Sequence, residues 1–335
     1  MSEAGSRYVV LSGVRNRTHL VYASSYLRHV LDTHPGTVEL VVLPTGGLLA
    51  EGALGQEAVH ALLPDDERLT IRLSASTDVR AAPVDTELVC IGAPTVRAWT
   101  AFTVAHQGRR PRVVVVDEGL GSYGTWRTRR AAYLREGGRE PRSTVRAVAV
   151  ATGARVLPDL RWALYREETA GWSVNEQVAD EFRRRLDGPP APAGRAVYLT
   201  QPWSALGVLG ARGYRAHLDE VRTAVEAAGL DMAVKPHPWE PAEVYRGLTV
   251  LEGGPAELER PVVGAALVLG ANSTALLNLA AIHATRVVRI GIPELQPLDD
   301  ALAPDQRSLL DAFLPRAVTA DRLDLGSEVG SGGET

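Results

Sequence analysis

The chain has 335 residues, of which 45% are hydrophobic and 23% are charged, and its formal net charge is −4. This composition is typical of a soluble globular protein too long for a single core, and the slightly acidic balance disfavours general nucleic-acid binding. The one cysteine, Cys90, excludes a disulfide framework and fits a reducing cytoplasm, and no apolar run approaches the ~18 residues needed to span a bilayer.

The first half of the sequence predicts βα units around a parallel sheet. Short runs rich in valine and isoleucine alternate there with longer amphipathic segments. Four consecutive valines at residues 113–116 predict a strand buried on both faces, in the middle of the sheet. The expected strands are residues 8–12, 38–43, 69–73, 88–91 and 112–117, and the clearest helix is residues 96–106.

A stretch rich in proline and glycine, residues 188–195, predicts a linker between two domains. The N-terminal α/β domain is then residues 1–187 and the C-terminal α/β domain residues 196–325, and the tail 326–335 is expected to be disordered. In the second domain we expect strands at 196–200, 232–235, 248–251, 266–270 and 286–290, with helices at 214–228 and 274–284.

The alternation predicts two Rossmann-type, doubly wound domains that face a central crevice, where open α/β sheets bind ligands at the carboxyl ends of their strands. The usual dinucleotide, P-loop and zinc-protease motifs are absent from the sequence. The chemistry must therefore be sought in three short polar stretches, each expected to follow a strand.

The first stretch is Asp117-Glu118-Gly119, directly after the valine strand. Two neighbouring carboxylates repel each other, which raises the pKa of at least one and suits it to proton abstraction. Gly119 allows the backbone to turn sharply. A polar turn at the end of a strand is the structural alternative.

The second stretch is Lys235-Pro236-His237-Pro238. The flanking prolines hold the backbone of His237 extended, which suits its imidazole to bind or protonate a phosphate oxygen. Lys235 is the only lysine among the 36 basic Lys and Arg residues, and its ammonium group would add positive charge. A surface loop with an incidental histidine is the alternative.

The third stretch, residues 270–274, ends in Ser273-Thr274 at the predicted start of a helix. Free backbone N–H groups beside two hydroxyls form an anion site, although the same residues would cap any helix.

Taken in order, these stretches resemble the motifs of the bacterial sialyltransferases and polysialyltransferases. That family has an acidic-acidic-Gly motif, a His-Pro motif and a Ser-Ser/Thr pair, with a Pro-x-Glu between the last two. The matching residues are Asp117-Glu118-Gly119, His237-Pro238, Pro255-Ala256-Glu257 and Ser273-Thr274.

The resemblance implies a GT-B architecture and an inverting transfer of sialic acid, or a related acidic sugar, from a CMP-activated donor to the hydroxyl of a glycan or small-molecule acceptor. It implies no metal and no cofactor beyond the CMP-linked co-substrate. Glu118 would be the base, with Asp117 in support, and His237 the leaving-group stabiliser or acid. Ser273 and Thr274 would bind the phosphate and Glu257 the ribose, while Lys235, Pro238 and Gly119 would complete the donor site.

Two alternatives remain at this stage. The CDP-polyol phosphotransferases also carry His-Pro and a Ser-Ser pair, but with Asp-Tyr where this chain has Ala271-Asn272. A non-catalytic nucleotide-binding protein of the same fold is the other.

Residues 127–146 hold seven arginines against two acidic residues, Glu136 and Glu140. That run is either a solvated helical face or a patch for an acidic acceptor or a peripheral membrane contact.

Overall fold

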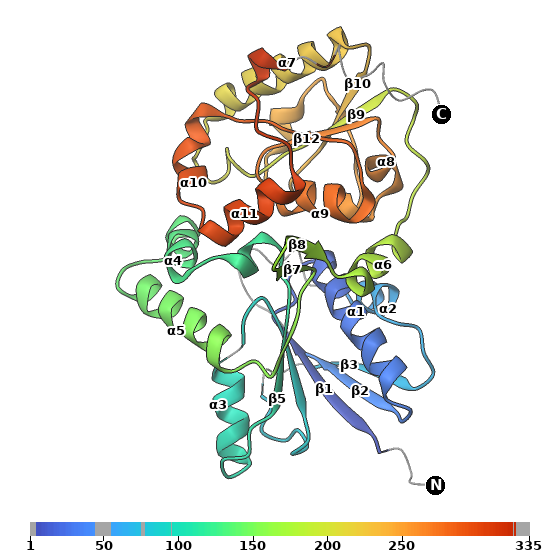
Figure 1. The fold of residues 1–335 in the computed structure, drawn as a ribbon, viewed down its shortest axis with the longest axis vertical. Coiled ribbons are helices and arrows are strands. Elements are labelled where there is room, and N and C mark those ends of the chain that lie inside the picture. The colour runs from blue at the N-terminus through green and yellow to red at the C-terminus, as the bar shows by residue number, and fades with distance from the viewer. Residues whose placement is uncertain (1–4, 44–54, 75–77, 95, 324, 326–335) are drawn as a thin grey trace. The chain divides into compact units, whose positions relative to one another are not determined.

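The computed structural model describes residues 5–43, 55–74, 78–94, 96–323 and 325, so the predicted tail 326–335 lies outside the described residues. The chain divides into two compact units, Met1–Arg185 and Leu186–Thr335. Each unit contains one parallel β-sheet with helices packed against it (Figure 1). In the part of the chain that the structure describes, no helix is both long and apolar enough to cross a membrane.

The first unit is a six-stranded parallel sheet in the order β3-β2-β1-β4-β5-β6. This is the Rossmann order, and its direction of winding reverses between β1 and β4. The expected strands are confirmed to within one residue at each end. They are β1 (Arg7–Ser12), β2 (Val38–Val42), β3 (Leu69–Leu73), β4 (Glu87–Ile91) and β5 (Arg112–Val116), and β6 (Leu160–Trp162) completes the sheet.

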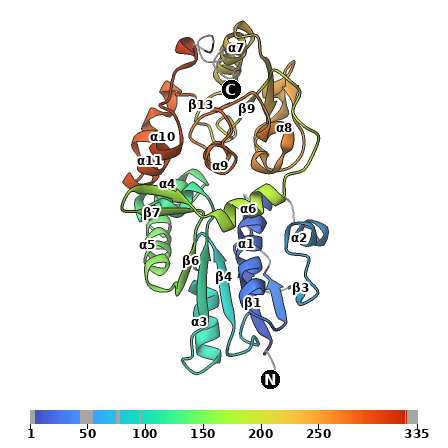
Figure 2. The same ribbon diagram turned by 45° about the vertical axis from the view of Figure 1, so that its right-hand side comes forward.

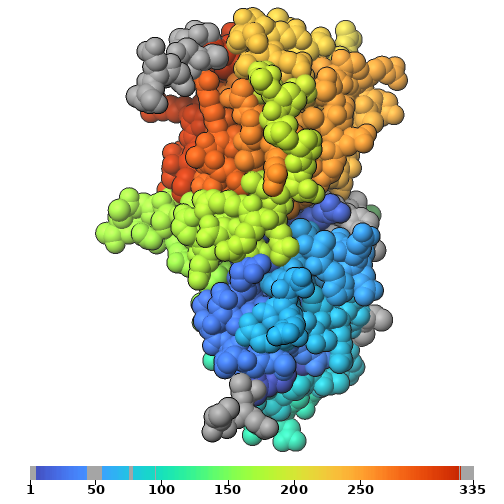
Figure 3. Space-filling model, turned by 90° about the vertical axis from the view of Figure 1, so that its right-hand side faces the viewer, coloured from blue at the N-terminus to red at the C-terminus, as the bar shows by residue number. Residues whose placement is uncertain are grey.

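Helices cover both faces of this first sheet (Figures 1 and 2). On one side lie α1 (Arg17–Thr33), α2 (Gln56–Leu62) and α6 (Glu176–Arg184), and Figure 3 shows α1 and α2 in blue on that face. The rings of Tyr22 on α1 and Phe182 on α6 meet edge to face at 5.0 Å. On the other side lie α3 (Val96–Ala105), α4 (Trp126–Arg135) and α5 (Arg142–Val156).

The valine strand β5 lies one position from the edge of the sheet, between β4 and β6, and not at its centre. Its four valines are nevertheless buried on both faces, as expected. No strand was predicted at β6, which has only three residues. The antiparallel pair β7 (Tyr165–Glu168) and β8 (Gly171–Val174) was not predicted either, because its apolar residues are separated by charged residues and a turn.

The second unit is a five-stranded parallel sheet in the order β11-β10-β9-β12-β13, which again reverses direction beside its first strand, here between β9 and β12. The strands are β9 (Arg195–Leu199), β10 (Asp231–Lys235), β11 (Thr249–Val250), β12 (Leu267–Gly270) and β13 (Val287–Arg289). The helices are α7 (Ala211–Ala227), α8 (Arg260–Val263), α9 (Thr274–His283), α10 (Gln296–Asp300) and α11 (Pro304–Phe313). The strand predicted at 248–251 is only two residues long because β11 is an edge strand paired with β10 alone.

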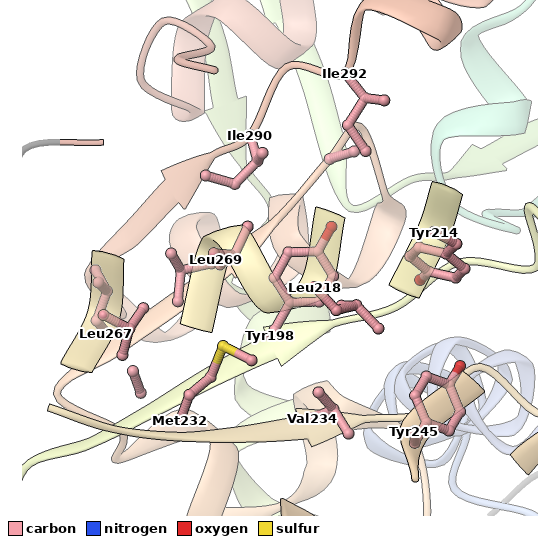
Figure 4. Close-up of a cluster of buried hydrophobic side chains, with 14 of the residues drawn as sticks. Tyr198, Tyr214, Leu218, Met232, Val234, Tyr245, Leu267, Leu269, Ile290 and Ile292 are labelled. Atoms are coloured by element: carbon pink, nitrogen blue, oxygen red, sulfur yellow. The ribbon is translucent and has the colours of Figure 1, made fainter. Parts of the chain in front are cut away.

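The core of the second unit lies between this sheet and α7 (Figure 4). Tyr198 on β9 and Leu269 on β12 are fully buried against Tyr214 and Leu218 of α7. Each such buried side chain stabilises the fold by ~1.5–3 kcal/mol. The core therefore fixes the strands rigidly, and with them the loops that leave their carboxyl ends.

Candidate functional site

All three polar stretches follow the carboxyl end of a parallel strand, as predicted. Asp117 follows β5, Pro236 follows β10 and Ala271 follows β12. In the second sheet, Leu199 of β9 is in register with both Lys235 and Gly270. Loops that leave β9, β10 and β12 therefore begin at the same level, beside the point where the winding reverses. This is where open α/β sheets bind ligands.

Asp117, in the first unit, is buried and fully engaged with its surroundings. The hydroxyl of Tyr123 and the N–H of Leu164 each donate a hydrogen bond of 2.7 Å to its Oδ2. Burial raises the pKa of Asp117 to about 6, against these hydrogen bonds, which lower it. The charge of Glu118 raises that pKa too, as predicted, but burial is the larger cause. Asp117 thus ties the short 3-10 helix η1 (Leu120–Tyr123) to the start of β7.

Glu118 is the more accessible of the two acids, with 23% of its side chain exposed. Its Oε1 lies 3.3 Å from Nη1 of Arg129 on α4. The carboxylate also lies directly over the glycine that follows β4, because a Cβ on Gly92 would come within 2.2 Å of Glu118 Cδ. Gly119, with φ of +102°, provides the sharp turn predicted for it. The geometry separates a buried, anchored acid from a partly exposed one.

His237, in the second unit, is held by two hydrogen bonds, one at its backbone and one at its ring. Its N–H donates to Thr200 Oγ1 at 2.7 Å, and its ring Nδ1 accepts from the N–H of Trp239 at 3.2 Å. Burial lowers the pKa of His237 to about 4, so the imidazole is neutral at neutral pH. Since Nδ1 is an acceptor, the proton resides on Nε2, which is left as a hydrogen-bond donor.

Side-chain hydrogen bonds join this histidine loop to the start of α9. Gln201, next to Thr200, donates from Nε2 to the carbonyl of Asn272 at 3.0 Å. Ser273 is the N-cap of α9, and its Oγ accepts the N–H of Leu276 at 3.0 Å. A capping hydroxyl still has its own hydrogen to donate, and N–H groups in the first turn of a helix have no acceptor within the helix. The N-cap and the anion-site interpretations of Ser273-Thr274 are therefore compatible.

Lys235 is placed differently from the expectation of a free positive charge. Its Nζ lies 2.8 Å from both carboxylate oxygens of Glu259 and donates to the carbonyl of Glu252 at 3.2 Å. Both side chains of the ion pair are about nine-tenths buried. The ammonium group thus holds the loop between β11 and α8 and uses its three donors there.

Glu257 lies in that same loop, on the 3-10 helix η3 (Ala256–Leu258), and is buried. Its Oε1 accepts a hydrogen bond of 3.4 Å from Asn278 of α9, and its carbonyl oxygen lies 3.0 Å from His283 Nε2. Glu257 therefore belongs to the packing between η3 and α9. Pro238, by contrast, is solvent-exposed.

Three residues of the site region, Thr200, Glu259 and Arg289, were not predicted from the sequence. Arg289, the last residue of β13, donates from Nε to the side chain of Asn272 and is paired with Asp311. No sequence motif marks these residues. The single lysine, Lys235, could have prompted a search for an acidic partner, which is Glu259. Within the described ranges, no three His, Cys, Asp or Glu side chains are grouped so that they could hold a metal ion.

No family of known proteins matches the sequence, and no curated protein matches it either. Among solved structures, a protein from Listeria monocytogenes described as a UDP-N-acetylglucosamine 2-epimerase has a TM-score of 0.54 at 11% identity, over 95% of this chain and 85% of that one. The S. aureus MnaA–UDP structure has a TM-score of 0.49 at 10% identity, over 96% and 87% of the two chains. Phytolacca americana UGT2, with UDP-2-fluoroglucose and pterostilbene, has a TM-score of 0.46 at 10% identity, over 94% and 88%.

At these identities the likeness is one of fold. Together with the two strand orders, the first match supports an α/β, GT-B-like architecture of two Rossmann-type domains.

Proposed function

We propose that the protein is an inverting, metal-independent glycosyltransferase that moves sialic acid, or a related acidic sugar, from a CMP-activated donor to an acceptor hydroxyl. The observation that carries the proposal is the connection of the His237 loop and the Ser273 helix start through Thr200 and Gln201, at the point where the second sheet reverses. A neutral imidazole donor and a capped helix start on one sheet edge suit a phosphate.

In this proposal the second unit binds the nucleotide. His237 donates its Nε2–H to the phosphate oxygen that gains charge as the bond to the sugar breaks. Ser273, Thr274 and the first turn of α9 bind the other phosphate oxygens. Glu257 contacts the ribose, and Lys235 acts indirectly, because its ion pair with Glu259 positions the loop that carries Glu257.

The first unit then serves the acceptor. Glu118 takes the proton from the acceptor hydroxyl as the new bond forms between that oxygen and the anomeric carbon of the sugar, and the electron pair of the broken bond leaves with the CMP phosphate. Asp117 and Gly119 position the base. Asp117 anchors η1 through Tyr123, and Gly119 allows the sharp turn directly after Glu118. This division of roles follows the family that the motifs resemble.

The test is thermal unfolding of the full chain with CMP, CDP or UDP. A ligand that binds only the native state raises its stability, by ~2.7 kcal/mol at 100 times its Kd. We expect CMP to raise the melting temperature most, and His237→Ala to reduce that rise. His60→Ala, which removes an exposed histidine on α2 of the first unit, serves as the control.

The competing functions give different results in the same experiment. Stabilisation by CDP but not by CMP would favour the polyol phosphotransferase, and stabilisation by UDP alone would refute a CMP donor. Stabilisation by CMP without any transfer or hydrolysis of CMP-sialic acid would identify a non-catalytic nucleotide-binding protein.

A further inference from the structure

Helix α5 is packed with small side chains inward, and three of its four valines are exposed. The buried residues of α5 are Ser143, Ala147, Gly153 and Ala154. Val145, Val148 and Val156 are 66%, 43% and 69% exposed. A helix of a soluble protein normally buries its apolar stripe, and each valine left in water forfeits most of the free energy of its burial.

The exposed valines share one face of α5. At 100° per residue, Val145, Val148 and Val156 lie within one sector of the helix, together with the exposed Ala149 and Thr152. The exposed arginines of α5 border this stripe on both sides. They are Arg142 and Arg146 on one side and Arg155 on the other.

Helix α4, which lies beside α5, extends the same kind of surface (Figures 1 and 2). None of its residues is buried, and Trp126 at its start is 39% exposed. The guanidinium of Arg127 lies 5.5 Å from the centre of the Trp126 ring, and Arg146 of α5 lies 4.2 Å from that of Tyr133 on α4. Aromatic and cationic groups are thus interleaved across the two helices.

The two helices carry charge of one sign, and the exposed connection between them holds two acids, Glu136 and Glu140. Neither α4 nor α5 contains an acidic residue, and together they carry seven arginines. Arg129 and Arg130 form ion pairs with Glu118 and Glu140. Among the described residues, the other five have no acidic partner within 4.0 Å, and they are Arg127, Arg135, Arg142, Arg146 and Arg155.

We propose that the α4–α5 surface, formed by Trp126, the three exposed valines and these five arginines, docks the protein on an anionic lipid membrane. Valine and tryptophan side chains can enter the boundary between headgroups and acyl chains while the arginines stay at the level of the phosphates. A second copy of the chain fits this surface poorly, because two such faces would bring like charges together. The proposal is independent of the nucleotide chosen above.

The experiment is vesicle flotation of the full chain, with vesicles of phosphatidylcholine alone and of phosphatidylcholine with roughly a third phosphatidylglycerol. We expect flotation with the anionic vesicles only, and its loss at high salt. Replacing Arg142, Arg146 and Arg155 by glutamine should weaken binding about 100-fold, since each arginine near an anionic surface contributes ~1 kcal/mol. The matched control replaces three exposed basic side chains of the second unit, Arg212, Arg246 and Arg316, by glutamine.

The apolar half of the surface is tested separately. Val145→Ser with Val156→Ser should reduce flotation at least ~10-fold, because each lost methyl group that enters the bilayer is worth ~0.8 kcal/mol. Val104→Ser on α3, a change of a 74% exposed valine outside the surface, should leave it unchanged. All these side chains are exposed, so circular dichroism should show intact folding. The proposal is wrong if the protein floats equally with neutral and anionic vesicles, or with neither. It is also wrong if the arginine and valine variants instead dissociate a homodimer of the chain.

Discussion

At the scale of single residues, Asp117 and Glu118 show how two adjacent acids acquire different properties. Successive residues after a strand point in different directions, and here Asp117 is directed into the fold while Glu118 remains partly exposed. Asp117 accepts two hydrogen bonds of 2.7 Å, whereas Glu118 accepts one of 3.3 Å from Arg129. A base must be accessible to the substrate whose proton it takes, so the partly exposed Glu118 suits that role better than the buried Asp117.

We expect Glu118→Gln to lower transfer by ~10² to 10⁴-fold with nearly unchanged CMP affinity, because the amide keeps the shape of the carboxylate but cannot accept a proton. Steady-state transfer from CMP-sialic acid and isothermal titration with CMP measure the two quantities. Glu136→Gln, on the exposed connection between α4 and α5, is the matched control.

Asp117→Asn distinguishes the two acids. The amide can replace only part of the hydrogen bonding to Tyr123 and Leu164, so this variant should lose thermal stability as well as activity. Full transfer by Glu118→Gln, with loss of transfer by a stably folded Asp117→Asn, would make Asp117 the base.

Asp117, His237 and Ser273 could be singled out as candidates because each follows an apolar run that is recognisable in the sequence. Their partners could not. Gly92 lies under Glu118 because β4 and β5 are neighbours in register, and Thr200 fixes His237 because β9 pairs with β10. Such contacts depend on strand order, which periodicity along the chain does not reveal.

At the scale of elements, the buried ion pair of Lys235 and Glu259 joins the end of β10 to the loop before α8. Gly253 completes the arrangement, since its φ is +119° and a Cβ there would lie 2.3 Å from Glu259 Oε1. The ion pair therefore connects the loop that contains Glu257 to the last residue of β10. The charge pair and the glycine hold one end of the loop, and the contacts of Glu257 with Asn278 and His283 of α9 hold its middle.

Lys235→Met should destabilise the protein by about 3–5 kcal/mol, because it leaves the carboxylate of Glu259 buried without its partner. The double variant Lys235→Met/Glu259→Leu should recover most of that loss, since an apolar pair of similar volume needs no desolvated charge. Urea unfolding measures both. The control is Arg80→Met, which removes one partner of the exposed Arg80–Asp78 pair and should cost about 1 kcal/mol or less.

If the double variant were as unstable as the single one, the ion pair would not be the interaction that holds the loop. CMP affinity adds a second measurement: it should fall in Lys235→Met and return in the double variant, as expected for a positioning role without contact to the nucleotide.

The elements themselves were predictable to different degrees. Except for the three-residue β6, the strands of both sheets were predicted, because buried parallel strands are continuous apolar runs. The β7–β8 pair was missed because its apolar residues, Tyr165, Trp172 and Val174, form no continuous run, and α5 has no normal amphipathic pattern because its small residues are the buried ones. Elements that pack in an unusual way are the ones that a hydrophobic pattern misses.

At the scale of the whole molecule, the two units use one strand order but contain different buried titratable groups. His19 is in the first unit, and His217 and His237 are in the second. Burial lowers the pKa of each of these histidines to about 4. The first unit also holds Asp117, with its pKa raised to about 6, and the second holds Glu240, whose pKa burial also raises.

These shifts predict that the protein loses stability as the pH falls from about 6.5 towards 4. In that window an unfolded chain protonates its histidines at their usual pKa of 6.5, while the folded chain keeps all three neutral, so protonation favours unfolding. Asp117 acts in the opposite direction, because its raised pKa stabilises the folded state at low pH and this contribution is lost as the pH rises through about 6. His19 and Asp117 therefore offset each other in the first unit.

In the second unit two histidines act together, offset only in part by Glu240, so the acid sensitivity should come mainly from there. Calorimetry of the full chain should give a lower melting temperature at pH 5 than at pH 7. His217→Gln should narrow that difference, because glutamine does not titrate but can still hydrogen-bond to the hydroxyl of Tyr198, which lies 2.9 Å from His217 Nε2. His60→Gln, an exposed change in the first unit, should not. A melting temperature that is the same at both pH values, or higher at pH 5, would mean that the buried histidines are not kept neutral by the fold.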